Sequence, residues 1–138
     1  MSVILSIKPK YAMKIFSGEK KVEFRKKVWI KINKIKKVYL YVSGHIGQIL
    51  GTFLIENILK ENPKTLWYLY KEVGGISKEE FDSYFNNTYQ GNGIYIKNPV
   101  KFKQPIDPYE LDPNFRPPQN FMYVRKDLEK KLEKMEVV

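Results

Sequence analysis

The stretch GEKKVEFR, residues 18–25, decides the fold of this chain. Gly18 predicts the end of a helix, because glycine readily adopts the left-handed conformation that closes a helix. After it, Val22 and Phe24 alternate with charged residues, which is the period-two pattern of a half-buried strand. Successive side chains of a strand point to opposite faces, so these two hydrophobic residues are expected to face the core. The stretch therefore predicts a helix, a sharp turn and a strand.

The charged residues of this strand, Glu23 and Arg25, are expected to share the opposite face. A carboxylate two residues away can hold the guanidinium in a fixed orientation and leave some of its donors free for a phosphate or a base edge. The alternative is an internal salt bridge that steadies the sheet, and the two roles are compatible. Lys20 precedes the strand. It is predicted to lie at the turn, near the mouth of a cleft that this face lines.

Further strands and helices are predicted outward from this stretch. The strands are expected at 3–7, 38–43, 49–59, 93–97 and 99–103, with a loop or short strand at 29–32. The helices are expected from Pro9 to Gly18, over 62–73, over 77–85 and over about 125–136. Asn62 and the Ser77-x-x-Glu80 capping box begin the middle two helices. Between them and the last helix, residues 105–118 form a proline-rich loop with one helical turn near 109–111.

This order of elements predicts an α+β fold, a small mixed β-barrel of about five to six strands with peripheral helices. Helices do not alternate regularly with strands, which argues against a doubly wound sheet. The length of 138 residues suits a single domain over 1–138, with the C-terminal helix packed on it.

Positive charge is concentrated at one end of the sequence. The net charge is +10, and the first 40 residues hold 12 basic and 2 acidic side chains, whereas the remainder holds 13 of each. The whole excess thus lies in the first third of the chain, as in a protein that binds a polyanion. The alternative is a solvated lysine-rich face that keeps the protein soluble.

Several classes of protein are disfavoured by the composition. The chain has no cysteine and one histidine, His45, so no disulfide framework, thiolate site or metal centre is expected, and no cofactor. No apolar run approaches the about 18 residues of a membrane span, and the N-terminus lacks a signal peptide. A cytoplasmic protein, without membrane association and monomeric, is the expectation.

The octapeptide matches a known signature. Residues 18–25 read G-x-K-x-x-E-x-R and follow a helix that opens with KPKYA at 8–12. Together with the strand pair at 38–59 and the stretch FRPPQ at 115–119, this pattern resembles the ASCH family. The resemblance covers most of the chain, as in a small stand-alone archaeal or bacterial member, and implies the PUA-like barrel.

The resemblance also implies that the chain binds RNA, with a base or nucleoside in a basic cleft and a role in translation, RNA modification or regulation. Lysines around the cleft would neutralise phosphates, and Tyr11 would stack on a base, although solvated lysines and a core tyrosine are the alternatives. Arg116 and Gln119 would add contacts at the rim, or serve only the loop. The residues expected to contact nucleic acid are Lys20, Glu23, Arg25, Lys8, Lys10, Lys21, Tyr11, Arg116 and Gln119.

An enzyme of the same family is the second reading. Some members look like amidohydrolases of acetylated cytidine and others like ribonucleases, and in the former the signature lysine is catalytic. Catalysis here would then rest on Lys20 and Glu23. The amidohydrolase pattern has a threonine where this chain has Glu23, and a downstream acid for which Glu72 is near the right distance unless Gly74 takes that place.

A DNA-binding transcriptional regulator is the third reading. The turn between the helices at 62–73 and 77–85 has the length of a helix-turn-helix. Neither helix is basic, and Glu79, Glu80 and Asp82 at the start of the second would repel phosphates. DNA is therefore a weaker expectation than RNA.

Overall fold

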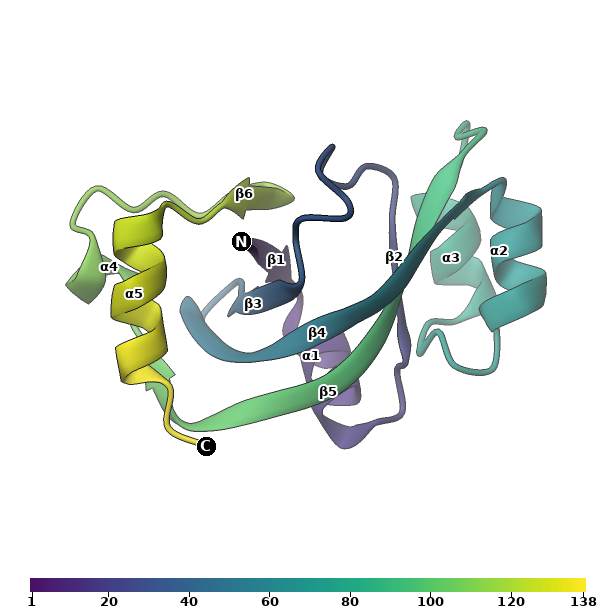
Figure 1. Cartoon of the computed structure of the whole chain (residues 1–138). Coiled ribbons are helices and arrows are strands. Elements are labelled where there is room, and N and C mark those ends of the chain that lie inside the picture. The colour runs from purple at the N-terminus through teal and green to yellow at the C-terminus, as the bar shows by residue number, and fades with distance from the viewer.

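The computed structural model describes residues 1–138, and its centre is one six-stranded sheet that curls into half a barrel (Figure 1). The strands are β1 (Ser2–Ile7), β2 (Val22–Arg25), β3 (Lys37–Val42), β4 (Gln48–Glu61), β5 (Gly91–Ile106) and β6 (Phe121–Tyr123). They lie in the order β2-β5-β4-β3-β1-β6. β1 pairs with β3 in parallel, and every other neighbouring pair is antiparallel. The α+β class and the strand number are as predicted.

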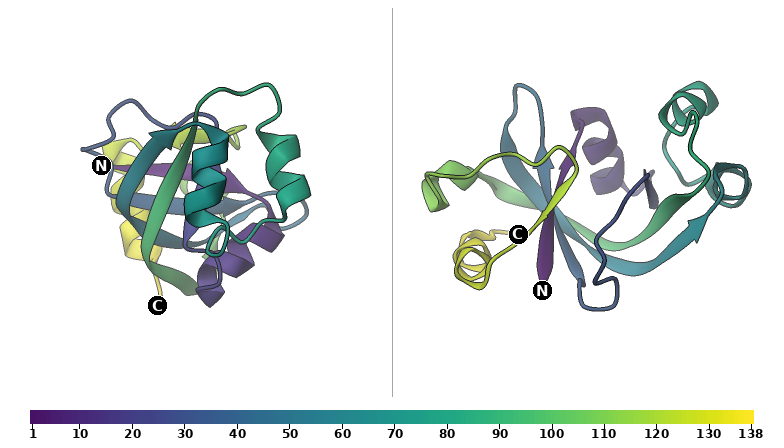
Figure 2. Two further views of the ribbon diagram at one scale, coloured as in Figure 1. Left: turned by 90° about the vertical axis from the view of Figure 1, so that its right-hand side faces the viewer. Right: turned by 90° about the horizontal axis from the view of Figure 1, so that it is seen from above.

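Five helices surround the sheet. Local signals mark the end of the first and the starts of the second and third, although the second ends at Tyr70 rather than at the predicted residue 73. The helices are α1 (Pro9–Ser17), α2 (Pro63–Tyr70), α3 (Lys78–Tyr84), α4 (Pro108–Leu111) and α5 (Lys126–Met135). Gly18 closes α1 with a φ of 85°. The Asn62 side chain accepts a hydrogen bond from the Thr65 amide at the start of α2, and the Ser77 side chain accepts one from the Glu80 amide at the start of α3. Helices α2 and α3 lie at one end of the sheet, and α4 and α5 at the other (Figures 1 and 2).

The prediction of two strands at 93–97 and 99–103 was wrong, because β5 runs unbroken through Asn98 and Pro99. Asn98 has a φ of 49°, and the pairing of β4 with β5 changes register nearby, between Thr52 and Leu54. A bulge of this kind bends a strand and accommodates a proline without ending it. β4 and β5 therefore curve along the whole molecule and join its two ends.

The sheet is buried on both faces where β1 and β3 lie. Val3 and Leu5 pack with Ala12 and Ile15 of α1, whereas Ile4 on the other face packs in the cluster that includes Leu128 and Leu132 of α5. This explains why the strand at 3–7 is a continuous apolar run rather than an alternating one. A third cluster joins β2 to the α2–α3 pair, as described next.

Val22 and Phe24 of β2 pack against Leu66 of α2 and Phe81 and Phe85 of the α3 region, as the alternation in the octapeptide predicts. The Phe24 and Phe81 rings meet edge to face with centroids 5.0 Å apart. This packing fixes α3 beside β2, where residues of both elements line the site described below.

The segment between β2 and β3 contains no strand, so 29–32 is a loop. Trp29 is fully buried, with its ring edge to face on Phe121. Strand β6, which pairs with β1, had no counterpart in the predicted elements. No helix is both long enough and apolar enough to cross a bilayer.

Candidate nucleic-acid site

A cavity of about 670 Å³ opens between the polar face of β2, the end of β1 and helix α3. This volume lies within the range of small-molecule and cofactor sites in proteins. Its lining is Ser6, Ile7, Lys8, Tyr11, Lys20, Glu23, Phe24, Arg25, Tyr41, Ser43, Ile76, Glu79, Glu80, Ser83, Tyr84, Pro117, Pro118 and Gln119. The octapeptide thus supplies the floor, and segments distant in sequence supply the walls.

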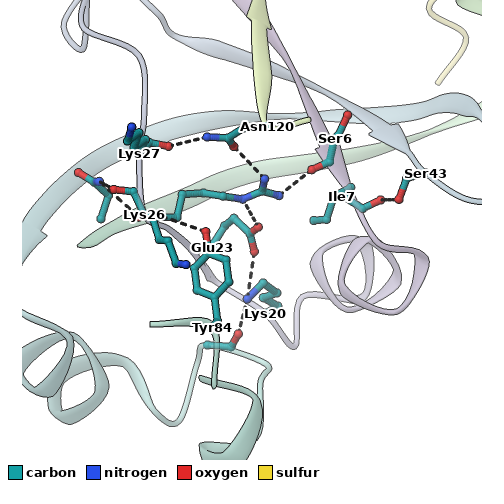
Figure 3. Close-up of polar contacts among 12 residues, drawn as sticks. Ser6, Ile7, Lys20, Glu23, Lys26, Lys27, Ser43, Tyr84 and Asn120 are labelled. Atoms are coloured by element: carbon teal, nitrogen blue, oxygen red, sulfur yellow. Dashed lines mark hydrogen bonds and ion pairs between the residues drawn. The ribbon is translucent and has the colours of Figure 1, made fainter. Parts of the chain in front are cut away.

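The three charged signature residues form one continuous polar chain on this floor (Figure 3). The Glu23 carboxylate lies between the two cations, with Oε1 3.2 Å from Lys20 Nζ and Oε2 2.7 Å from Arg25 Nε. Lys20 Nζ also donates to the carbonyl oxygen of Gly74. The internal salt bridge between Glu23 and Arg25, one of the two predicted roles, is therefore present.

The Arg25 guanidinium is held on all three of its nitrogens. Nε donates to Glu23, Nη1 donates to Asn120 Oδ1 at 3.0 Å, and Nη2 donates to the Ser6 carbonyl at 2.8 Å. Much of the fork that was expected to bind a ligand is engaged within the protein. Arg25 thus connects β2 to β1 and to the 117–120 segment, and so shapes the cavity.

Lys20 is buried rather than placed at the mouth of the cleft as predicted, with only 2% of its side chain exposed. Residues of the α2–α3 connection cover it, and its ammonium lies 5.3 Å from the ring centroids of both Tyr11 and Phe24. Burial lowers the pKa of Lys20, and the neighbouring Glu23 carboxylate offsets this only in part. Burial acts to raise the pKa of Glu23, but Lys20 and Arg25 outweigh it and hold that pKa below its usual value.

A second polar group closes the wall beside α1. Tyr11 donates its hydroxyl to Glu80 Oε2 at 2.6 Å, and Lys10 Nζ forms an ion pair with the same oxygen. Hydrogen bonds from Lys10 and Tyr11 lower the pKa of Glu80 to about 2, so this carboxylate is ionised at neutral pH. Burial and the neighbouring Glu80 raise the pKa of Tyr11. Tyr11 is thus fixed by α3, with its ring in the cavity wall.

The cavity gathers some of the predicted contact residues and leaves others out. Lys8, Tyr11, Lys20, Glu23, Arg25 and Gln119 line it. Lys21, Lys10 and Arg116 do not, because Lys21 is exposed beside the strand, Lys10 is engaged by Glu80, and Arg116 is exposed before the two prolines. The cavity lining itself is balanced rather than basic, since its cations Lys8, Lys20 and Arg25 face its acids Glu23, Glu79 and Glu80.

Sequence reasoning missed the contribution of α3 to this site. Glu79, Glu80 and Ser83 line the cavity from one face of α3, where Ser83 follows the two acids by four and three residues, and Ile76 lines it from just before the N-cap Ser77. That periodicity is visible in the sequence, but nothing local indicates what the face covers. Ser6 and Ser43 were missed for the same reason.

The amidohydrolase pattern is not completed here. The carbonyl of Gly74 accepts the Lys20 hydrogen bond, while Glu72 is exposed and lies outside the lining. Nowhere in the chain do three Asp, Glu, His or Cys side chains gather closely enough to hold a metal ion.

The half-barrel and the signature on its polar face define an ASCH domain of PUA-like fold. An ASCH domain-containing ribonuclease of Zymomonas mobilis is 28% identical over 135 residues, covering 94% of this chain and 88% of that protein. The chain belongs to the family described as Domain of unknown function (DUF365), whose model matches residues 1–113.

Solved structures agree with the assignment of an ASCH fold. The crystal structure of ASCH from Zymomonas mobilis superposes with a TM-score of 0.90 at 25% identity, covering 98% of this chain and 95% of that one. The N-terminal domain of Staphylothermus marinus McrB has a TM-score of 0.61 at 11% identity, covering 97% and 93%, and shares the fold alone.

Proposed function

We propose that this protein binds RNA and places one nucleoside unit of a single strand in the cavity between β2 and α3. The observation that carries the proposal is the cavity itself, which is large enough for a nucleoside and presents aromatic rings beside polar groups. Unstacked bases of single-stranded RNA are bound in this way, by stacking on aromatic side chains and hydrogen bonding at their edges.

The charge balance of the cavity suits a base or a sugar better than a phosphate. The lining carries as many acids as cations, and the Ser83 and Gln119 side chains form no hydrogen bond within the chain. Carboxylates and free amide and hydroxyl groups are partners for base edges and for the 2′-hydroxyl of ribose. Recognition of the 2′-hydroxyl would favour RNA over DNA, so DNA is a useful competitor in the test.

Filling the cavity without disturbing its buried floor tests this proposal. Ser83 is exposed on α3 and lines the cavity, so Ser83→Trp is expected to weaken the binding of a single-stranded RNA by about tenfold or more, equivalent to about 1.4 kcal/mol. Fluorescence anisotropy with a labelled oligonucleotide measures the dissociation constant.

The matched control is Ser83→Ala, which removes one hydroxyl but adds no bulk, and which is expected to lose much less affinity than the tryptophan variant. Equal affinities for the tryptophan variant and the wild type would mean that the cavity does not hold the nucleoside. Equal affinities for RNA and DNA of one sequence would remove the role of the 2′-hydroxyl.

A second candidate function is RNA cleavage, and a specific feature of the site favours it. Breaking a phosphodiester requires a proton to leave the attacking hydroxyl or water and another to reach the departing oxygen. The lowered pKa of Lys20 brings its amine closer to the range where it exchanges protons, and Glu23 holds it in place. The ribonuclease of Zymomonas mobilis, similar over nearly the whole chain, supports the same reaction here.

If the protein cleaves RNA, Lys20→Met should lower the cleavage rate by about 100-fold or more, since general acid–base groups contribute at least that much. The loss is measured on a labelled RNA by gel electrophoresis at saturating protein. Lys21→Met is the control, because Lys21 is adjacent in sequence but is exposed and lies outside the cavity. Cleavage that survives in the Lys20 variant would exclude Lys20 from the chemistry. RNA left intact by the wild type would exclude cleavage and leave the binding proposal standing.

A further inference from the structure

We propose that residues 26–36, the loop between β2 and β3, form a phosphate-binding track for the RNA strand as it leaves the cavity. The track rests on the proposed function, because it assigns a path to the same RNA. It also accounts for the positive charge that the charge-balanced cavity does not contain. Four observations support it, namely charge, exposure, anchoring and continuity with the cavity.

The loop carries the densest unopposed charge in the chain. Its sequence KKVWIKINKIK contains five lysines and no acid. All five are exposed, and none forms an ion pair, unlike Lys10, Lys37 or Lys78 elsewhere. The lysines are Lys26, Lys27, Lys31, Lys34 and Lys36. Their charges are therefore available to an external polyanion.

The loop is anchored, so its lysines are held in place before a ligand arrives. Trp29 and Ile35 are each only 1% exposed and insert into the core beneath it. The amide of Ile30 also donates to the hydroxyl of Tyr123 at 3.2 Å. A segment fixed at buried points loses less conformational freedom on binding than a free tail would. This distinguishes the loop from a merely solvated lysine run.

The track begins at the rim of the cavity. The amide of Lys26 donates to the hydroxyl of Tyr84, a cavity residue, at 2.9 Å, and the Lys26 ammonium lies 5.2 Å from the centroid of the same ring. Asn120 bonds Arg25 through Oδ1 and the carbonyl of Lys27 through Nδ2, as Figure 3 shows. A strand whose base enters the cavity would therefore meet Lys26 and Lys27 first. The remaining lysines lie beyond them.

The test removes three charges from the loop and compares the result with an equal loss elsewhere. The track variant is Lys26→Gln/Lys31→Gln/Lys34→Gln. The control is Lys101→Gln/Lys103→Gln/Lys130→Gln, whose lysines are also exposed and unpaired. Lys101 and Lys103 lie on β5, whereas the loop joins β2 to β3 at the top of Figure 1. Both variants have the same net charge.

The measurement is the dissociation constant of a single-stranded RNA across a series of salt concentrations. Each neutralised phosphate contributes about 0.7 to the slope of log affinity against log salt, so the track variant should lose about 2 from that slope, and about tenfold or more in affinity at low salt. The control variant should keep the wild-type slope.

The outcomes separate this inference from the proposed function. An unchanged slope in the track variant, or an equal loss in the control, overturns the track. If Ser83→Trp still weakens binding in either case, the cavity proposal stands. A slope that falls only in the track variant, with Ser83→Trp binding normally, supports the track and refutes the cavity. Binding to vesicles rich in phosphatidylserine is measured as well. If the loop lysines are needed for binding to these vesicles and the protein does not bind RNA, the loop is a membrane-binding segment and the proposal is overturned.

Discussion

Glu23→Gln is expected to lower the free energy of unfolding by about 3 to 5 kcal/mol, the usual cost of removing one partner from a buried ion pair. Glu23 is the only carboxylate between Lys20 and Arg25, and its side chain is 7% exposed. Its neutralisation would leave the buried Lys20 and the partly buried Arg25 near one another with no counter-charge. Chemical denaturation monitored by tryptophan fluorescence measures the change, since Trp29 is buried in the native core.

The control for this prediction is Lys20→Met, which removes one of the two cations that contact Glu23 and leaves the carboxylate in place. In that variant Glu23 keeps its ion pair with Arg25, in which Nε lies 2.7 Å from Oε2. The protein also no longer bears the cost of burying the Lys20 ammonium, the same cost that lowers the pKa of Lys20. The loss is therefore expected to stay within about 1 kcal/mol, as when a buried charge is replaced by an apolar group of similar volume. Equal losses in the two variants would contradict this account, because Lys20 would then stabilise the fold as much as Glu23 does.

The same carboxylate adds a pH dependence whose sign follows from its lowered pKa. A carboxylate with a lower pKa in the folded state stabilises the protein above its unfolded pKa, near 4.5, and this contribution is lost as the pH falls through the folded value. The wild type should therefore lose stability below about pH 4.5. Glu23→Gln should lose less over the same range.

Gly51→Ala is expected to destabilise the protein by about 3 kcal/mol or more, through overpacking at the centre of the sheet. Gly51 lies in β4, opposite Leu40 of β3 and Lys101 of β5. A methyl group there would come within 2.1 Å of the Val100 carbonyl oxygen and 2.6 Å of the Phe16 ring. Since the carbonyl belongs to the paired backbone, relief requires the two long strands to separate.

Gly18→Ala provides the comparison, because an added methyl group at this position meets no atom within 4 Å. Its φ of 85° is nevertheless strained for alanine, at a cost of about 1 to 2 kcal/mol. Thermal or chemical unfolding of the two variants should rank them in that order. A Gly51 variant as stable as the Gly18 variant would mean that the sheet relaxes around position 51.

Some features of the site could be predicted from the sequence of residues 18–25, and others depend on segments that are distant in the sequence. The turn at Gly18, the inward Val22 and Phe24, and the shared face of Glu23 and Arg25 were all predictable, because each depends on residues within a few positions. The burial of Lys20 was not, because the α2–α3 connection that covers it lies more than fifty residues away, as shown by the hydrogen bond to Gly74 at a separation of 54.

The continuous β5 shows the same limit in the fold. Asn98 and Pro99 appear locally as a break between two strands, and only the partner β4, with its own register shifts, lets the strand continue through a bulge. In contrast, α2 and α3 begin at Asn62 and Ser77 as predicted, since a capping side chain bonds an amide three residues along the chain.

By itself, the sequence determined the helix, turn and strand of residues 18–25, the capped helices, the α+β class and the segregation of positive charge to the first third of the chain. These follow from local sterics, short-range hydrogen bonds and simple composition. The tertiary structure alone decided that Ser6 and Asn120 would accept hydrogen bonds from Arg25 and that α3 would close the cavity. It also decided that the unpaired lysines would lie on the 26–36 loop rather than inside the cavity. The physical reason is that burial and partner choice depend on contacts between distant segments, such as the 95 residues that separate Arg25 from Asn120.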